Sequence, residues 1–228
     1  SAGQEDAVSA YATTQADRIA DHESKEVWSD RFDRAAGRVG NAWTLDMGFG
    51  PLAELLDGAV TISGQNDRGG RTRVFQKLPP DRFLAISAEL TVGTDAKGTR
   101  SGMFITSERT RPGGEPQVTA EVVVCRNRDG QLEVRVQKTP TDEDASYQEV
   151  VGPEWSVGEP IRVSIERAGD DLDATFTVYV DGEPVATGIE CDRHVSSRQP
   201  VHFGVFAEGE AGRRADLTFD DFRDVRRR

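Results

Sequence analysis

The chain has 228 residues, a formal net charge of −12 at pH 7 and 36% hydrophobic residues. This acidity argues against nucleic acid and anionic membranes as partners, because both bind surfaces rich in lysine and arginine. The length suffices for one large domain with its own core. No apolar run reaches the roughly 18 residues of a membrane helix, so we expect no membrane insertion.

Residues 1–26 differ from the remainder, since they are alanine-rich, polar and without β-branched runs. Their loosely helical spacing predicts either a short helix or a disordered linker to an upstream domain, and both alternatives stay open. The opening residues also lack the basic and apolar regions of a signal peptide. We therefore expect a linker or helix at 1–26 and one β domain at 27–228.

From Val27 onward, apolar and polar residues alternate in short runs, the pattern of half-buried strands. The longest run, 83–92, places Leu84, Ile86 and Leu90 on one face. We predict further strands at 27–32, 58–63, 72–77, 101–107, 118–126, 132–138, 201–208 and 216–225, a hairpin within 161–187, and a possible short strand at 147–151.

Two hairpins are indicated by their turn residues. Asp181-Gly182 follows alternating runs in 161–180 and supplies the positive-φ chemistry of a tight turn. Asp129-Gly130 occupies the same place between 118–126 and 132–138, where valines at alternate positions predict a core-facing side. About ten short strands separated by turn signals indicate an all-β, two-sheet antiparallel sandwich.

Several segments together resemble the concanavalin A-like jelly rolls. They are Asp30-Arg31-Phe32-Asp33 followed by Trp43, then LLDGAVTISG, SGMFITSER, the stretch EWSVGEPIRVSIERAGDDLDATFTVYVDGEPVATG and the closing VHFGVFAEGEAGRRADLTFDDFRDVRR. The resemblance spans residues 27–226 and is nearest the laminin G-like and 3-keto-disaccharide hydrolase branches. It implies a jelly-roll fold, an extracytoplasmic location, and a role as lectin, glycan-cleaving enzyme or adhesion module.

Carboxylates are the first candidates for chemistry. Retaining glycosidases need two of them about 5 Å apart, and the resemblance implies a Glu-x-Asp-x-x-Glu string on one strand, which this sequence lacks. Glu121, Glu133 and Glu166 are instead predicted as single carboxylates on outward strand faces. Glu121 is the best single acid/base candidate, with an ordinary solvated glutamate as the alternative.

Three aspartates are the candidates for a metal site. Asp170, Asp171 and Asp173 offer hard oxygen ligands for calcium. Aspartates before a hairpin also serve turns, and no Asp-x-Asp-x-Asp-Gly loop is present, so the structural interpretation is favoured. No other cofactor is expected.

The histidines and cysteines form no recognisable centre. His22, His194 and His202 share no metal-ligand spacing. Cys125 falls in a predicted strand and Cys191 in a loop region, so a disulfide between them is left open.

Aromatic and arginine side chains are the candidates for glycan binding. Trp43 and Trp155 match family positions that pack the core, whereas Tyr147 is placed in a polar loop and is the freest ring. Five arginines cluster around one hairpin and its preceding loop, where they can bind an acidic or hydroxyl-rich glycan or pair with carboxylates. They are Arg109, Arg111, Arg126, Arg128 and Arg135.

Our first functional hypothesis is a non-catalytic glycan-binding or adhesion module of a larger extracytoplasmic protein. It would bind a glycan or cell-surface component through Arg109, Glu121, Arg126, Arg135 and Tyr147. The alternative is a glycoside hydrolase of the 3-keto-disaccharide hydrolase type with Glu121 as acid/base. A third hypothesis is a structural domain whose sheet meets a protein partner.

Overall fold

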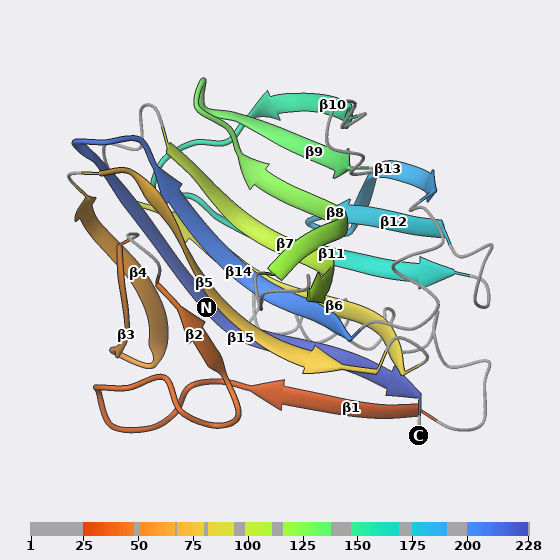
Figure 1. Cartoon of the computed structure of the whole chain (residues 1–228), viewed down its shortest axis with the longest axis horizontal. Helices are drawn as coiled ribbons and strands as arrows, with labels where there is room; N and C mark the ends of the chain where they lie inside the picture. The colour runs from red at the N-terminus through yellow and green to blue at the C-terminus, as the bar shows by residue number, and fades with distance from the viewer. Residues whose placement is uncertain are drawn as a thin grey trace, which may run out of the picture.

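The computed structural model describes residues 25–47, 51–66, 68–79, 82–93, 99–110, 116–137, 147–168, 175–190 and 200–227. These ranges form fifteen β-strands and no helix (Figure 1). Consequently no helix in the described part is long and apolar enough to cross a membrane. The predicted N-terminal helix or linker lies almost wholly outside the described residues.

The strands form two antiparallel sheets, so the predicted all-β sandwich is confirmed. The eight-stranded sheet has the order β13-β12-β11-β6-β15-β4-β3, with β1 paired to β15; the seven-stranded sheet has the order β10-β9-β8-β7-β14-β5-β2. The bounds are β1 Lys25–Asp30, β2 Thr44–Asp46, β3 Leu52–Leu56, β4 Ala59–Asn66, β5 Gly70–Leu78, β6 Phe83–Val92, β7 Thr99–Thr110, β8 Pro116–Arg126, β9 Gln131–Gln137, β10 Tyr147–Glu154, β11 Pro160–Ala168, β12 Thr175–Val180, β13 Glu183–Glu190, β14 Val201–Gly209 and β15 Arg213–Arg227.

Both predicted hairpins are present, with different turns. Asp181 and Gly182 have φ of 49° and 88°, as a two-residue turn of this kind requires. At the other hairpin only Gly130 has positive φ, 90°, and the Asn127 side-chain oxygen accepts hydrogen bonds from the backbone N–H groups of Asp129 and Gln131. The loop between β8 and β9 is therefore wider than the dipeptide alone predicts.

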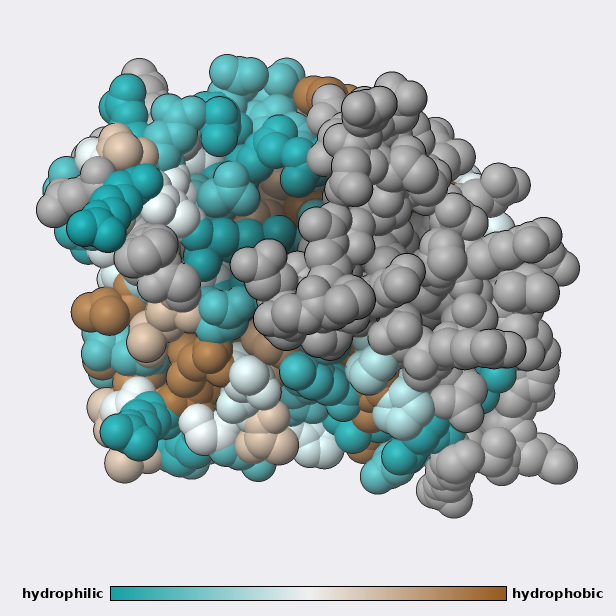
Figure 2. Space-filling view, viewed as in Figure 1, coloured by the Kyte–Doolittle hydropathy of each residue, from teal (hydrophilic) through white to brown (hydrophobic). Residues whose placement is uncertain are grey.

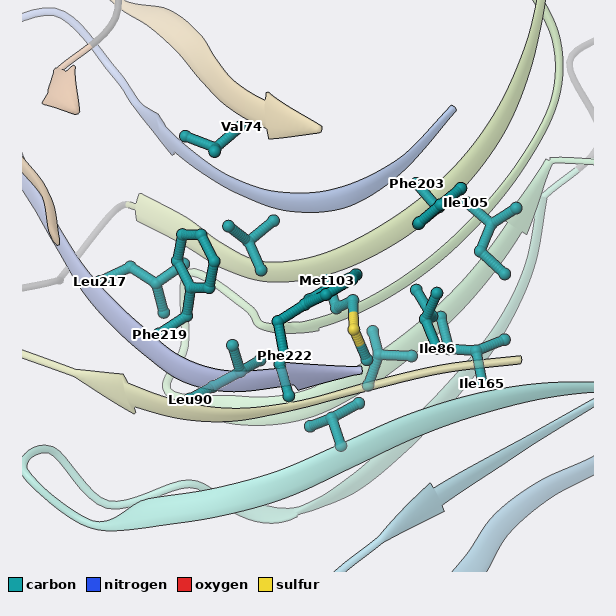
Figure 3. Packing of buried hydrophobic residues seen from close by; sticks show 14 of the residues in the cluster. Val74, Ile86, Leu90, Met103, Ile105, Ile165, Phe203, Leu217, Phe219 and Phe222 are labelled. Carbon is teal, nitrogen blue, oxygen red and sulfur yellow. The ribbon is translucent and has the colours of Figure 1, made fainter. Parts of the chain in front are cut away.

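The main core lies between the two sheets. Figure 3 shows side chains from the seven-stranded sheet, among them Met103 and Phe203, facing Ile86 and Phe222 of the eight-stranded sheet. Trp43 is buried in this core and contacts Phe222 edge-on at 4.7 Å between ring centroids. Trp155 is buried too, so the prediction that both tryptophans are structural is confirmed.

Two strands, β2 and β3, were not predicted. Both are short edge strands, and neither carries a long alternating run. Exposed hydrophobic residues lie here: Leu52 and Leu56 in β3, and Met47 directly after β2. Figure 2 shows the corresponding hydrophobic surface at the end of the molecule where Figure 1 places β2, β3 and β4.

Candidate functional site

The candidate site lies on the face of the seven-stranded sheet that points away from the main core, which we call the outer face. Alternation along β8 defines it: Val122 and Val124 belong to the main core, whereas Val123 and Cys125 belong to a separate cluster. Glu121 shares the parity of Val123 and Cys125 and is therefore on the outer face.

An apolar floor covers the middle of the outer face. It comprises the side chains of Phe75, Phe104, Val123, Cys125 and Phe206, each at most 4% exposed, and we call it the outer cluster. Phe104 contacts both of the other rings, at centroid distances of 6.4 and 6.2 Å. The seven-stranded sheet is therefore packed on both faces, which holds its strands firmly in place.

Arg71, from β5, lies over the outer cluster. Its guanidinium carbon is 4.1 Å from the ring centroid of Phe206 and 5.1 Å from that of Phe104. Its Nη1 atom donates to Glu121 Oε1 at 2.9 Å. A planar guanidinium stacked on aromatic rings has little freedom to turn, so Arg71 fixes the Glu121 carboxylate in one position.

Arg100, from β7, holds a second carboxylate. Its Nη2 atom lies 3.1 Å from Glu133 Oε1 and 3.4 Å from Oε2, and only the second contact has hydrogen-bond geometry. The Glu133 side chain is 5% exposed, yet its Oε1 has no hydrogen-bond partner among the described residues. The Arg100 guanidinium therefore neutralises this carboxylate, although Oε1 itself receives no hydrogen bond.

The two carboxylates occupy neighbouring strands and the same face. Glu133 on β9 is paired with Cys125, and Glu121 lies four residues from Cys125 on β8. Four residues of strand span about 13 Å. The two backbone positions are therefore well separated along the sheet.

Two glycines allow the central strands to approach closely. A Cβ atom at Gly102 would overlap the carbonyl oxygen of Val124, and one at Gly204 would overlap that of Val74. Both glycines fall in outer-face rows, opposite Cys125 and Phe75 respectively. The strand spacing beneath the site thus depends on the absence of side chains at these positions.

Cys125 and His202 contribute packing to the outer face. Burial, with Glu133 nearby, raises the pKa of the Cys125 thiol to about 12, so the thiol stays protonated and is a poor nucleophile. The thiol is free, so the disulfide that the sequence left open is not formed; Cys191 lies outside the described residues. His202 is buried and stacks on Phe75 at 5.2 Å.

The structure separates the predicted arginine cluster. Arg135 pairs with Val123 and is on the outer face with Glu121, whereas Arg126 pairs with Leu132 and is on the opposite face. Arg126 Nε donates to the carbonyl oxygen of Trp155 at 2.9 Å. The expectation that these arginines form one binding face is therefore wrong.

The other predicted residues have mixed outcomes. Arg128 pairs with Glu210 at 2.6 Å, at the end of the strands. Arg109 lies in β7 and Tyr147 opens β10, so Tyr147 is in a strand and not in a loop. The side chains of both lie outside the described part, as do Arg111, Asp170, Asp171, Asp173, His22 and His194.

Burial of Glu121 and Glu133 corrects the expectation of solvated surface glutamates. Both are at most 5% exposed as residues, because ion pairs from β5 and β7 hold them against the outer cluster. The sequence contained one signal of this: Val122-Val123-Val124-Cys125 is a continuous apolar run, typical of a strand buried on both faces. Arg71 and Arg100 had no comparable signal.

Metal ligation is not supported within the described residues, where no three His, Cys, Asp or Glu side chains are grouped to hold an ion. Asp221, on the eight-stranded sheet, pairs instead with Arg162 at 2.8 Å and Arg223 at 3.1 Å. The calcium candidates Asp170, Asp171 and Asp173 lie outside the described ranges, so that prediction stays a prediction.

No protein-family model and no curated protein matches the sequence. Several solved structures, in contrast, match the fold of this chain. SCLam, a non-specific endo-β-1,3(4)-glucanase from family GH16, aligns with a TM-score of 0.66 and 11% identity over 91% of this chain and 93% of that one. The laminarinase from Rhodothermus marinus aligns with a TM-score of 0.63 and 16% identity over 88% and 96% of the chains.

A third similar structure comes from work on endo-acting O-glycanases with which human gut microbiota initiate mucin breakdown. Its TM-score is 0.63 and its identity 12%, over 87% of this chain and 98% of that one. Identities this low establish a shared fold, and the concanavalin A-like jelly roll is confirmed. The neighbours are glycan-cleaving enzymes, which overturns the expectation of a non-catalytic binding or adhesion module and favours its hydrolase alternative, without the 3-keto specificity.

Proposed function

We propose that the chain is a glycoside hydrolase that cleaves within polysaccharide chains, with its reaction centre on the outer face of the seven-stranded sheet. The observation that carries this is a pair of buried carboxylates with different surroundings. Both are paired with an arginine, Glu121 at 2.9 Å and Glu133 at 3.1 Å, but the Glu133 pair leaves the buried Oε1 atom without a hydrogen bond. The fold shared with endo-glucanases over most of both chains supports the same conclusion.

The two environments suit two different roles. Glycoside hydrolysis needs one carboxylic acid to protonate the leaving oxygen and one carboxylate to act at the anomeric carbon or on water. Glu133, whose Oε1 receives no hydrogen bond, is assigned as the acid. Glu121, held by the Arg71 guanidinium at 2.9 Å, is assigned as the base.

The proposed reaction is a single displacement at the anomeric carbon. Glu133 gives its proton to the glycosidic oxygen as the bond from that oxygen to the anomeric carbon breaks. A water oxygen bonds to the anomeric carbon, and Glu121 accepts the proton that this water releases. Arg71 and Arg100 are positioning residues, because they hold the two carboxylates and not the sugar in this step.

Because long polysaccharides occur outside cells, we propose an extracytoplasmic location and a glycan substrate. Hydrolysis is tested on β-1,3-glucan, mixed-linkage glucan, mucin glycans and acidic polysaccharides, by release of reducing ends and by the size of the products. Cleavage within chains shortens the polymer early, before small sugars accumulate.

The decisive variants are Glu121→Gln and Glu133→Gln, which keep shape and remove the acid–base function. Each is expected to lower kcat by about 10²–10⁴, the usual contribution of general acid–base catalysis. Glu54→Gln, at an exposed position of β3 on the other sheet, is the matched control and is expected to keep full activity. Failure to cleave any of these substrates, or full activity in Glu121→Gln, would contradict the proposal.

A further inference from the structure

The seven-stranded sheet ends with β10, which lies beside the strand of Glu133. The strand order β8-β9-β10 places Glu121 first, then Glu133, then this edge strand. The register pairs Glu133 directly with Val151, and residues opposite each other in an antiparallel pair share a face. The Val151 side chain therefore belongs to the outer face, with its Cβ atom about 5 Å from that of Glu133.

Val151 is open to solvent and lies in an apolar part of the edge. It keeps 52% of its surface exposed, whereas the outer cluster is at most 4% exposed. Gly152 and Pro153, which follow it, have no polar side chain and are also at least partly exposed. The opposite edge of the sheet is charged, because Arg73 of β5 pairs there with Asp46 of β2 at 2.6 Å. The outer face thus has one charged and one apolar end.

The proposed reaction determines which part of a glycan reaches the apolar end. In a single displacement, the water and the leaving oxygen lie on opposite sides of the anomeric carbon. Glu121 acts on the water and Glu133 on the leaving oxygen, so the leaving sugar extends past Glu133 and away from Glu121. Within the described sheet, β10 is the only strand in that direction. The leaving sugar is therefore next to Val151.

We propose that Val151 contacts the sugar that leaves, and that this sugar carries a methyl group at the point of contact. The inference rests on the proposed function and adds the chemical class of the leaving unit. An apolar side chain gains from contact with a methyl group, whereas a hydroxyl placed there gives up water without a hydrogen bond in return. An N-acetyl group and a 6-deoxy sugar both present a methyl group, and separate arms of the experiment distinguish them.

Binding to the wild-type protein is measured by NMR titration with two pairs of probes. Methyl N-acetylglucosaminide is compared with methyl glucoside, and methyl fucoside with methyl galactoside of the same configuration. In one of the two pairs, the probe with the additional methyl group is expected to bind at least about fourfold more tightly, as burial of one methyl-sized group implies.

Val151→Thr replaces one methyl group by a hydroxyl and keeps a residue suited to strands. It is expected to abolish the preference within the probe pair, and Val151→Ala, which shortens the same side chain, is expected to reduce it. Val150→Thr is the matched control, because Val150 pairs with Val134 of the main core and so belongs to the other face, although it is 41% exposed. This control is expected to keep the preference.

Equal binding within both probe pairs, or a Val151→Thr protein that keeps the preference, would overturn the inference. An equal loss in Val150→Thr would also overturn it, since that side chain is on the opposite face. A preference that depends on Val151, without cleavage of any polysaccharide, would refute the hydrolase and leave the apolar contact standing. Cleavage together with equal binding of all probes would do the reverse.

Discussion

Asp30, the last residue of β1, accepts hydrogen bonds from the segment that joins β1 to β2, and its replacement tests how this end of the core is stabilised. Its carboxylate accepts hydrogen bonds from the Phe32 backbone N–H at 2.9 Å, from Trp43 Nε1 at 3.0 Å and from Asn41 Nδ2 at 2.9 Å. Arg34 adds two more, at 2.6 and 3.1 Å. The Asp30 side chain is only 4% exposed.

The cost of Asp30→Ala follows from which donors it leaves buried. The N–H groups of Phe32 and Trp43 belong to buried residues and would lose their acceptor, at about 1–3 kcal/mol each. The Arg34 side chain is 30% exposed and its partner can be water, so its loss costs little. We expect the free energy of unfolding to fall by about 2–6 kcal/mol.

A pH dependence accompanies this loss. Burial raises the pKa of Asp30, but hydrogen bonds from Arg34, Asn41, Phe32 and Trp43 outweigh burial and set it below the ordinary 3.8. A lowered folded-state pKa stabilises the protein above the unfolded pKa and is lost as pH falls through the folded one. The difference between wild type and Asp30→Asn is therefore expected to be constant at neutral pH and to shrink below about pH 4.

Urea unfolding followed by tryptophan fluorescence measures both effects, because Trp43 reports directly on this loop. Asp33→Ala, an exposed carboxylate three residues away, is the control and is expected to change stability by less than about 0.5 kcal/mol. A loss below about 1 kcal/mol for Asp30→Ala, or an equal loss for Asp33→Ala, would show that the hydrogen bonds do not hold the loop.

Three further predictions concern the core and the site. Gly102→Ala places a Cβ atom against the Val124 carbonyl oxygen. The free energy of unfolding is expected to fall by about 3 kcal/mol, which corresponds to roughly 6–12 °C in the Tm measured by calorimetry. An unchanged Tm would show that the strands can separate freely. Burial raises the pKa of Asp224 above the ordinary 3.8, despite its ion pair with Arg226. The contribution of Asp224 to the free energy of unfolding is therefore expected to decline as the pH rises from the unfolded-state pKa to the folded-state pKa. Asp224→Asn is expected to remove this decline, as measured by urea titrations from pH 3 to pH 7. The single displacement proposed for the two site carboxylates inverts the anomeric carbon, so an inverted product anomer is expected; NMR detection of a retained anomer would exclude these roles for the pair.

The fold was predictable where alternation is long. The predicted strand 83–92 coincides with β6, where every second residue from Ile86 to Val92 belongs to the main core. The Asp181-Gly182 turn was predictable because few residues adopt positive φ at two successive positions. The three-residue strand β2 and the edge strand β3 offer too few alternating positions to detect.

The site was predictable only in part. Glu121 was chosen correctly as an outer-face carboxylate, but its partner Arg71 is 50 residues away, on a strand that is not a neighbour of β8 in the sheet. No spacing rule connects two such positions. Glu133 was dismissed as an ordinary surface residue because its burial depends on Arg100 of β7, a contact that forms only once the sheet is assembled.

Gly102 and Gly204 set a limit on how this scaffold can diversify. A larger residue at Gly102 would push β7 away from β8, the strand of Glu121, and one at Gly204 would push β14 away from β5, the strand of Arg71. New substrate specificity is therefore expected chiefly from substitutions of the charged residues that lie over the outer cluster. Directed evolution of the protein would do best to mutagenise those groups and to leave both glycines untouched.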